Sequence, residues 1–180
     1  MNSYISLLRG INVSGKNKIK MADIRTQLSD IGLSDVATYI QSGNILFKSK
    51  EQDADLLANQ IKELLLSEYS YDVPVLVRSA DYWNRIAANH PFLTTGEEPL
   101  NQLYVVFLKE LPSAEHLDSI KGFTHKDDVF MVKDDAIYLY CPGGYGVTKL
   151  TNNFFERKLK VQATTRNWKT VSKLKELLEG

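Results

Sequence analysis

Hydrophobic and polar positions along the first 78 residues predict a strand, a helix, two strands, a helix and a strand, in that order. The apolar run at 3–9 is typical of a strand. An apolar spacing of three and four residues then predicts a helix with the inner face Met21, Ile24, Leu28 and Ile31. Gly32 is expected to end this helix, because glycine adopts the left-handed conformation without a steric penalty.

Two β-rich runs follow this helix. They occupy 36–41 and 44–48 and are separated by Ser42 and Gly43. Two strands joined by a short Gly-containing segment favour a hairpin, so a tight turn is predicted at Ser42-Gly43.

A second helix and a further strand complete the first half. Asp53 is a candidate N-cap for a helix with the inner face Leu57, Ile61, Leu64 and Leu65. Pro74 near the start of the strand at 73–78 favours an edge position. The order β-α-β-β-α-β is typical of a ferredoxin-like subdomain. Its two helices are expected to cover one sheet face and leave the other free.

The second half shows a similar series. Strands are predicted at 103–108, 129–132 and 137–141, with an acidic turn at Asp134-Asp135, and an extended piece at 161–164. Helices are predicted from the candidate N-cap Ser113 to Gly122, at 152–160, and from about 167 to 178. The prediction is an α+β chain of two ferredoxin-like subdomains, 1–78 and 102–180, with a connecting helix and linker at 79–101 and a C-terminal helix.

Composition favours a cytoplasmic globular protein. Hydrophobic residues make up 43% of the 180 residues and charged residues 24%, which is ordinary for a chain with a core. The single cysteine, Cys141, cannot form an internal disulfide, which favours a reducing compartment. No signal peptide or membrane span is predicted.

Charge is unevenly distributed although its sum is zero. Residues 1–25 hold five basic side chains and one acidic, and 145–175 hold eight basic and one acidic. The segment 26–144 holds 18 acidic and nine basic side chains. Basic ends favour an anion-binding surface, and the alternative is ordinary solvated helix surface.

Three segments together resemble one known family. They are Leu7-Leu-Arg-Gly-Ile-Asn-Val13 with Gly15 and Lys16, Tyr39-Ile-Gln-Ser-Gly-Asn-Ile45, and Thr165-Arg-Asn-Trp-Lys-Thr-Val171. The chain resembles the bacterial family known as domain of unknown function 1697, from Leu7 to about Leu174, and Gly146-Val-Thr-Lys-Leu150 also resembles that family's pattern. The resemblance implies a bacterial cytosolic protein of two subdomains with no established activity, and carries over no catalytic residues.

The loop after the first strand has the ingredients of an anion cradle. Its glycines let backbone N–H groups approach a ligand, and lysines add charge. The alternative is a polar crossover loop whose glycines satisfy turn geometry. The candidate ligand-binding residues here are Arg9, Gly10, Asn12, Gly15 and Lys16, with Gln41, Ser42 and Asn44 at the hairpin.

A second candidate loop, 142–149, runs from a strand to a helix and ends in Thr148-Lys149. A glycine turn in this context suits phosphate contacts, and a flexible connection is the alternative. Arg166 can grip a phosphate or carboxylate in a bidentate way. Asn167 is a candidate helix cap, and Trp168 is a stacking surface or a core anchor.

Other reactive side chains favour structural roles. Cys141 at a strand end is interpreted as a core residue. The spacing of His90, His116 and His125 does not indicate a metal site. Acidic pairs such as Asp127-Asp128 could hold a divalent cation, but turns are commonly acidic because this favours solubility. No metal is therefore predicted, and neither a cofactor nor a catalytic residue is assigned.

Three functions remain open. The first hypothesis is a small phosphorylated or anionic ligand held between the subdomains by Arg9, Lys16, Lys149 and Arg166. The second is nucleic-acid binding through a sheet face with the strand aromatics Tyr4, Tyr39 and Phe47 and the basic C-terminal helices. Zero net charge argues against strong phosphate-driven binding. The third is a protein-interaction module that uses edge strands.

Overall fold

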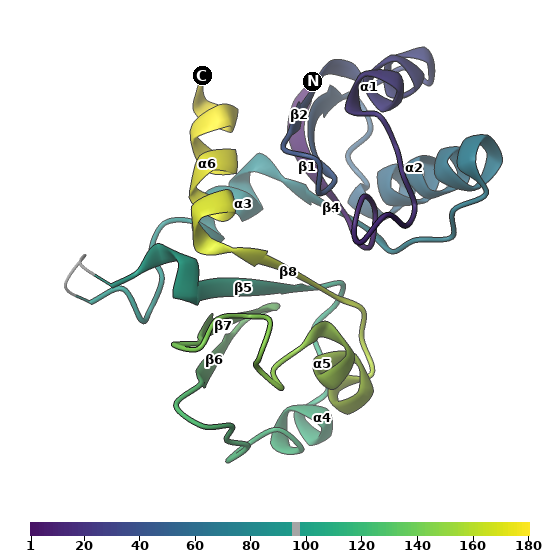
Figure 1. The fold of residues 1–180 in the computed structure, drawn as a ribbon. Coiled ribbons are helices and arrows are strands. Elements are labelled where there is room, and N and C mark those ends of the chain that lie inside the picture. The colour runs from purple at the N-terminus through teal and green to yellow at the C-terminus, as the bar shows by residue number, and fades with distance from the viewer. Residues whose placement is uncertain (95–97) are drawn as a thin grey trace. The chain divides into compact units, whose positions relative to one another are not determined.

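The chain is a mixed α+β protein with two four-stranded antiparallel sheets, as expected from its sequence (Figure 1). A computed structural model describes residues 1–94 and 98–180. It divides into two compact units, residues 1–85 with 174–180, and residues 86–173. The division falls inside the predicted connection at 79–101, of which residues 95–97 lie outside the described part.

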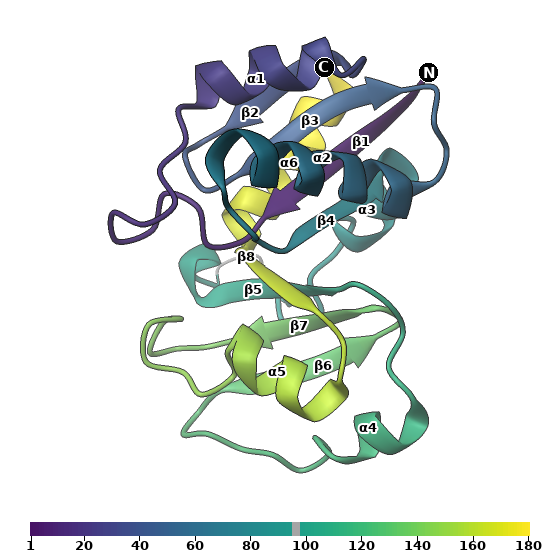
Figure 2. The same cartoon turned by 90° about the vertical axis from the view of Figure 1, so that its right-hand side faces the viewer.

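The first unit contains one sheet with the strand order β2-β3-β1-β4, and α1 and α2 lie on the same side of it (Figure 2). Every neighbouring pair of strands is antiparallel. Its elements are β1 (Asn2–Leu8), α1 (Met21–Asp30), β2 (Ser34–Tyr39), β3 (Asn44–Ser49), α2 (Ala54–Tyr69), β4 (Val75–Ser79) and α3 (Ala80–Ile86).

The sequence signals for both large helices of this unit are confirmed except at Ile31. Met21, Ile24 and Leu28 are buried, whereas Ile31 follows the last residue of α1 and is exposed. Gly32 comes next with a φ of +93°. The side chain of Asp53 accepts hydrogen bonds from two backbone N–H groups in the first turn of α2. A carboxylate there accepts hydrogen bonds from otherwise unpaired donors, and its negative charge interacts favourably with the positive end of the helix dipole.

The turn between β2 and β3 is longer than the predicted two-residue hairpin. Four residues, 40–43, separate Tyr39 from its partner Asn44. Gly43 has a φ of +79°, and a Cβ atom there would lie 2.6 Å from Cβ of Leu8. The wider turn brings backbone against β1, and only glycine fits so close an approach.

The second unit contains a sheet with the order β6-β7-β5-β8, again antiparallel throughout. The predicted extended piece at 161–164 overlaps the first two residues of β8, which runs from Ala163 to Asn167. Its elements are a 3₁₀ turn (Leu100–Gln102), β5 (Leu103–Leu108), α4 (Ala114–Asp118), β6 (Val129–Lys133), β7 (Ala136–Tyr140), α5 (Asn152–Leu159), β8 (Ala163–Asn167) and α6 (Trp168–Glu179), whose last residues group with the first unit.

Strand pairing repeats in the two units. Ile5 of β1 lies opposite Arg78 of β4, and Val105 of β5 lies opposite Arg166 of β8. The flanking pairs keep the same spacing, Tyr4–Ser79 and Leu8–Val75 in the first sheet and Tyr104–Asn167 and Leu108–Ala163 in the second. The second unit therefore repeats the strand order of the first, and its β5–β8 pair repeats the register of the β1–β4 pair.

Both faces of the first sheet carry buried side chains. Tyr4 and Phe47 stack on each other in the core beneath α1 and α2, with ring centroids 5.6 Å apart. Ile5 and Leu7 point to the opposite face, because successive strand residues alternate, and they are buried too. Leu46, which pairs with Ile5, lines a pocket with Leu177 and Leu178 of α6, so within the first unit the expectation of a free sheet face is wrong at this place. None of the described helices is long and apolar enough to cross a membrane.

Candidate anion-binding pocket

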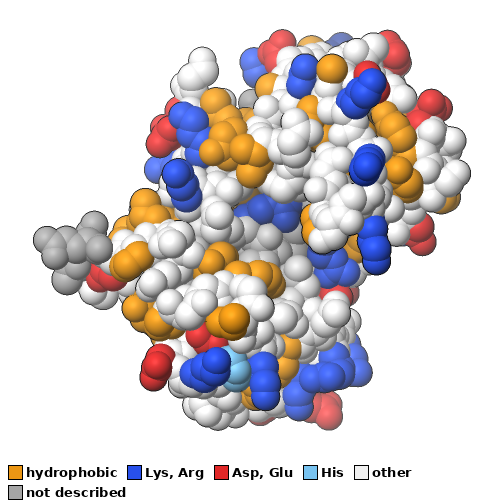
Figure 3. All heavy atoms as spheres, viewed as in Figure 1, with side chains coloured by type: hydrophobic (Ala, Val, Ile, Leu, Met, Phe, Trp, Pro, Cys, Tyr) orange, Lys and Arg blue, Asp and Glu red, His pale blue; other side chains and the backbone are white. Residues whose placement is uncertain are grey.

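A pocket in the second unit gathers cationic side chains beside α5. Its volume is about 580 Å³. Three lining residues are cationic and none of those described is acidic. The lining consists of Phe123, Thr148, Lys149, Thr151, Asn153, Phe154, Arg157 and Lys158. Lysine and arginine side chains are visible over this helix in Figure 3.

Helical spacing places the two cations of α5. Arg157 and Lys158 follow Phe154 by three and four residues, so all three side chains lie on one side of α5, the side that lines the pocket. The N-cap Thr151 fixes the start of the helix, because its hydroxyl accepts a hydrogen bond from the backbone N–H of Phe154 at 3.2 Å. The helix core thus determines which side chains reach the pocket.

Within the described residues, the three cations of the pocket form no ion pair with a carboxylate. Lys149 and Arg157 are exposed, and Lys158 is half-buried. Elsewhere in the chain lysines do pair, as Lys48 does with Asp35 at 2.8 Å. The charge of the pocket is therefore not neutralised by protein groups in this part of the chain.

A buried polar network supports the floor of the pocket. The hydroxyl of Thr148 donates to Oδ2 of Asp128 at 2.6 Å, and Nδ1 of His125 lies 2.8 Å from the same oxygen. The backbone N–H of Leu150 donates to the Thr148 hydroxyl at 3.0 Å. These bonds fix the backbone on both sides of Lys149.

Side chains also anchor the loop at 142–149 to the sheet. The Tyr145 hydroxyl donates to Oγ1 of Thr165 at 3.1 Å, and Oγ1 of Thr165 donates to Oδ1 of Asn152 at 2.6 Å. Gly144 has a φ of +83°, which the turn requires. The alternative of a flexible connection does not hold here, because the loop is tied to β8 and to the first turn of α5.

The equivalent helix start in the first unit carries the opposite charge. Glu51 and Asp53 both accept backbone hydrogen bonds there. Counted from the two N-caps, Asp53 and Thr151, the residue two positions earlier is Glu51 in the first unit and Lys149 in the second. Protein carboxylates therefore neutralise the start of α2 and are missing from the described start of α5.

The predicted site residues fall in both units. Arg9 to Asn44 lie in the first unit, and Lys149 and the Arg166–Trp168 segment lie in the second. Of the predicted residues, Lys149 lines the pocket beside α5.

In the first unit Asn12 has a structural role. Its side-chain amide donates to the carbonyls of Ile19 and Gln41 at 3.0 and 2.9 Å, and its Oδ1 accepts from the N–H of Ile19 at 2.9 Å. These bonds tie the loop after β1 to the turn between β2 and β3. The two candidate segments of this unit are thus brought together.

The other polar candidates of this unit lie around the same two turns. Gly10 and Gly15 are exposed with φ near +80°, and Lys16 is exposed at the tip of a turn closed by its N–H to the carbonyl of Val13. The backbone N–H of Arg9 donates to the carbonyl of Pro74 at 3.0 Å.

Asn44 is fully buried. Its amide donates to the Tyr39 carbonyl at 3.1 Å and to the Ser42 hydroxyl at 3.0 Å. Both Ser42 and Asn44 therefore help to hold the turn between β2 and β3.

The segment Arg166-Asn167-Trp168 joins β8 to α6. Oδ1 of Asn167 accepts from the N–H of Thr170 at 2.8 Å, which confirms the predicted cap. Trp168 is buried with its ring centroid 5.0 Å from that of His90, so it is a core anchor. Burial lowers the pKa of Arg166 to about 10, and its Nη1 donates to the Thr165 carbonyl.

The remaining reactive groups have structural environments. Cys141 is buried as predicted, and burial raises the pKa of its thiol to about 11. His90 is buried between the carbonyl of Tyr104 and the N–H of Phe92. Among the described residues, no three His, Cys, Asp or Glu side chains are grouped as metal ligands would be.

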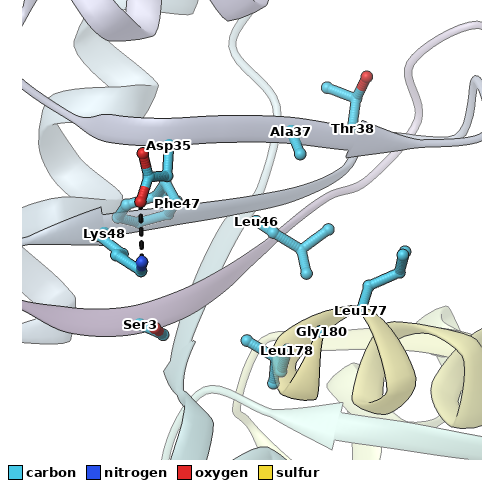
Figure 4. Close-up of a pocket in the computed structure, with 10 residues that line it drawn as sticks. All are labelled: Ser3, Asp35, Ala37, Thr38, Leu46, Phe47, Lys48, Leu177, Leu178 and Gly180. Atoms are coloured by element: carbon cyan, nitrogen blue, oxygen red, sulfur yellow. Dashed lines mark ion pairs between the residues drawn. The ribbon is translucent and has the colours of Figure 1, made fainter.

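A smaller pocket lies on the first unit, between the strands of its sheet and the end of α6 (Figure 4). Its volume is about 260 Å³, and Leu46, Leu177 and Leu178 give it an apolar side. Lys48 is paired with Asp35 at 2.8 Å, so the charge at its other side is neutralised. An anion would therefore be attracted less strongly to this pocket than to the pocket beside α5.

Sequence reasoning missed most of the pocket. Phe123, Arg157 and Lys158 were not predicted, although the basic pair next to the buried Phe154-Phe155 pair is visible in the sequence. Phe123 comes from the turn after α4, and only the fold brings it to α5. The aromatics Tyr4 and Phe47, named for base stacking, are buried in the core.

Comparisons with known proteins identify relatives without an assigned activity. A family model described as "Protein of unknown function (DUF1697)" matches residues 1–138. A solved structure of a conserved bacterial protein from Streptococcus pneumoniae is similar over 98% of both chains, with 26% sequence identity and a TM-score of 0.72. No curated protein matches. The family resemblance is confirmed, and the Thr165–Val171 motif lies beyond the matched residues.

Proposed function

The chain belongs to the DUF1697 family, whose function is unknown. From the pocket beside α5 we propose that the protein binds a small phosphorylated or otherwise anionic ligand there. The proposal includes a ferredoxin-like topology for both units and a cytoplasmic location. The ligand then lies within the second unit, on a surface that its own helix and loop form.

The observation that carries the proposal is the set of three cations that protein carboxylates do not neutralise. Lys149, Arg157 and Lys158 line one pocket with no acidic residue among its described neighbours. Like charges gathered on one surface repel each other unless a counter-ion is present. Arginine can form two parallel hydrogen bonds to a phosphate, and lysine adds a point charge.

The start of α5 adds to this attraction. Backbone N–H groups in a first helical turn lie at the positive end of the helix dipole. In the first unit Glu51 and Asp53 occupy that position, whereas Lys149 and Thr151 occupy it in the second. The difference favours an external anion in the second unit.

Isothermal titration with inorganic phosphate and ribose 5-phosphate tests the proposal. An Arg157→Gln variant is expected to bind ribose 5-phosphate about tenfold to a hundredfold more weakly, because a charge-assisted hydrogen bond contributes about 1.5–3 kcal/mol. Lys169→Gln is the matched control, since Lys169 is an exposed cation of the same unit outside the pocket. Equal affinities for wild type and Arg157→Gln would contradict the proposal.

A further inference from the structure

The pocket beside α5 has an aromatic wall as well as cations. Phe123 and Phe154 both line it, and their ring centroids lie 4.3 Å apart with an angle of 39° between the ring planes. Phe154 is buried, whereas Phe123 is half-buried. The two rings therefore form a continuous apolar surface of which Phe123 is the more accessible part.

A phosphate alone does not require such a wall. An anion gains from the cations and from hydrogen-bond donors, while an apolar surface beside it stays in contact with water. A flat ring gains instead from stacking on an aromatic side chain, and this gain does not depend on which base is present. The cationic and aromatic surfaces of one pocket thus fit two parts of one molecule.

The size and polar groups of the pocket agree with a two-part ligand. Its volume of about 580 Å³ lies within the range of about 300–1,000 Å³ typical of small-molecule sites. The exposed Asn153 offers both a donor and an acceptor at the pocket, whereas the Thr148 hydroxyl already donates to Asp128. Asn153 can therefore contact a ring edge or a sugar hydroxyl.

We propose that the ligand is a planar ring joined to a phosphate, as in a mononucleotide, with the ring on Phe123 and the phosphate at Lys149, Arg157 and Lys158. This inference rests on the proposed function and names the ligand class of the same pocket. The same chemistry occurs in a free mononucleotide and at the phosphorylated end of a strand.

Isothermal titration with inorganic phosphate, ribose 5-phosphate and AMP separates the ring from the phosphate. Wild type is expected to bind AMP about tenfold to a hundredfold more tightly than ribose 5-phosphate, which is the size of a stacking interaction. Phe123→Leu should lower the affinity for AMP to nearly that for ribose 5-phosphate, and it should leave the affinity for ribose 5-phosphate unchanged. Phe130→Leu is the matched control, since Phe130 lies outside this pocket.

The outcomes distinguish the two proposals. If wild type bound AMP and ribose 5-phosphate with equal affinity and Arg157→Gln bound neither, the proposed stacking of a ring on Phe123 would be wrong and the proposed anion site would stand. Failure of wild type to bind any of the three probes would overturn the anion site and the ring with it. A 5′-phosphorylated dinucleotide identifies the source: tighter binding than AMP indicates a strand end, and weaker binding indicates a free mononucleotide.

Discussion

The two units share a strand order and the register of one strand pair, β1–β4 in the first and β5–β8 in the second, and differ in where their long loops lie. In the first unit the long connection is 9–20, between β1 and α1, and only 50–53 join β3 to α2. In the second, 109–113 join β5 to α4, while 141–151 join β7 to α5. Each long loop is held by a polar side chain of its own, Asn12 in the first and Thr148, which donates to Asp128 before β6, in the second. One framework thus supports different surfaces at equivalent strand ends.

The largest expected effect concerns Gly43, the residue at which the hairpins of the two units differ most. Asp135 occupies the corresponding position in the second sheet: the carbonyl of Gly43 accepts from Leu8 and that of Asp135 accepts from Leu108. Gly43→Ala should destabilise the protein by about 2–4 kcal/mol, because the new Cβ would clash with Leu8 and the backbone has a positive φ.

Urea denaturation measures this difference. Gly32→Ala is the control, since Gly32 also has a positive φ but no atom lies within 4 Å of the new Cβ. It should cost about 1 kcal/mol. Equal losses in the two variants would show that close approach to Leu8 is not what selects glycine at Gly43.

The same hairpins show what the sequence could and could not predict. Asp134-Asp135 was predicted as a short turn and is one, since Lys133 pairs with Ala136. Ser42-Gly43 looked equally short, but Asn44 is buried and closes a four-residue turn through its side chain. A turn that is closed by a hydrogen bond from a buried side chain leaves no periodic signal.

Periodicity predicted α1, α2 and α5 well because each has a core face. The helix predicted from Ser113 to Gly122 is shorter, since α4 ends at Asp118 and has no buried residue, and less of β8 and of the pocket was predicted. Arg166 and Asn167 are polar, so the strand seemed to end at residue 164, yet they pair with Val105 and Tyr104. Lys149 was predicted from its loop, whereas Phe123 joins the pocket through tertiary contact with Phe154. Such contacts depend on the fold and not on local spacing.

A second prediction uses His90, which is buried in the second unit. Burial lowers the pKa of its imidazole below 6.5. At higher pH the imidazole is neutral in both the folded and the unfolded chain. As the pH falls through about 6.5, the unfolded chain takes up a proton that the folded chain does not, so the free energy of unfolding should fall by up to about 1.4 kcal/mol per pH unit.

Urea denaturation at pH 7, 6 and 5 measures this slope. His90→Gln should flatten it, because glutamine keeps a donor for the Tyr104 carbonyl and does not titrate. His116→Gln, which removes a half-buried imidazole of α4, controls for the loss of a histidine. The same slope in wild type and His90→Gln would exclude His90 as its source.

A third prediction transfers a charge from one unit to the other. Lys149→Glu places a glutamate two residues before the N-cap of α5, as Glu51 lies two residues before the N-cap of α2. Affinity for ribose 5-phosphate should fall by at least about tenfold, because one cation is lost and a carboxylate occupies the pocket. Lys160→Glu, just beyond α5 and outside the pocket, is the control in isothermal titration. A comparable loss in both variants would indicate a general charge effect.

The smallest expected effect compares the two helix caps. Asp53 accepts from two N–H groups, at 2.8 and 3.2 Å, while Thr151 accepts from one at 3.2 Å. Asp53→Ala should therefore cost about 1–2 kcal/mol and Thr151→Ala about 1 kcal/mol or less. Adding inorganic phosphate should restore part of the loss only in Thr151→Ala, because an anion at the start of α5 can replace the missing acceptor. Equal stabilisation of both variants by phosphate, measured by urea denaturation, would show that the two helix starts do not differ in their affinity for anions.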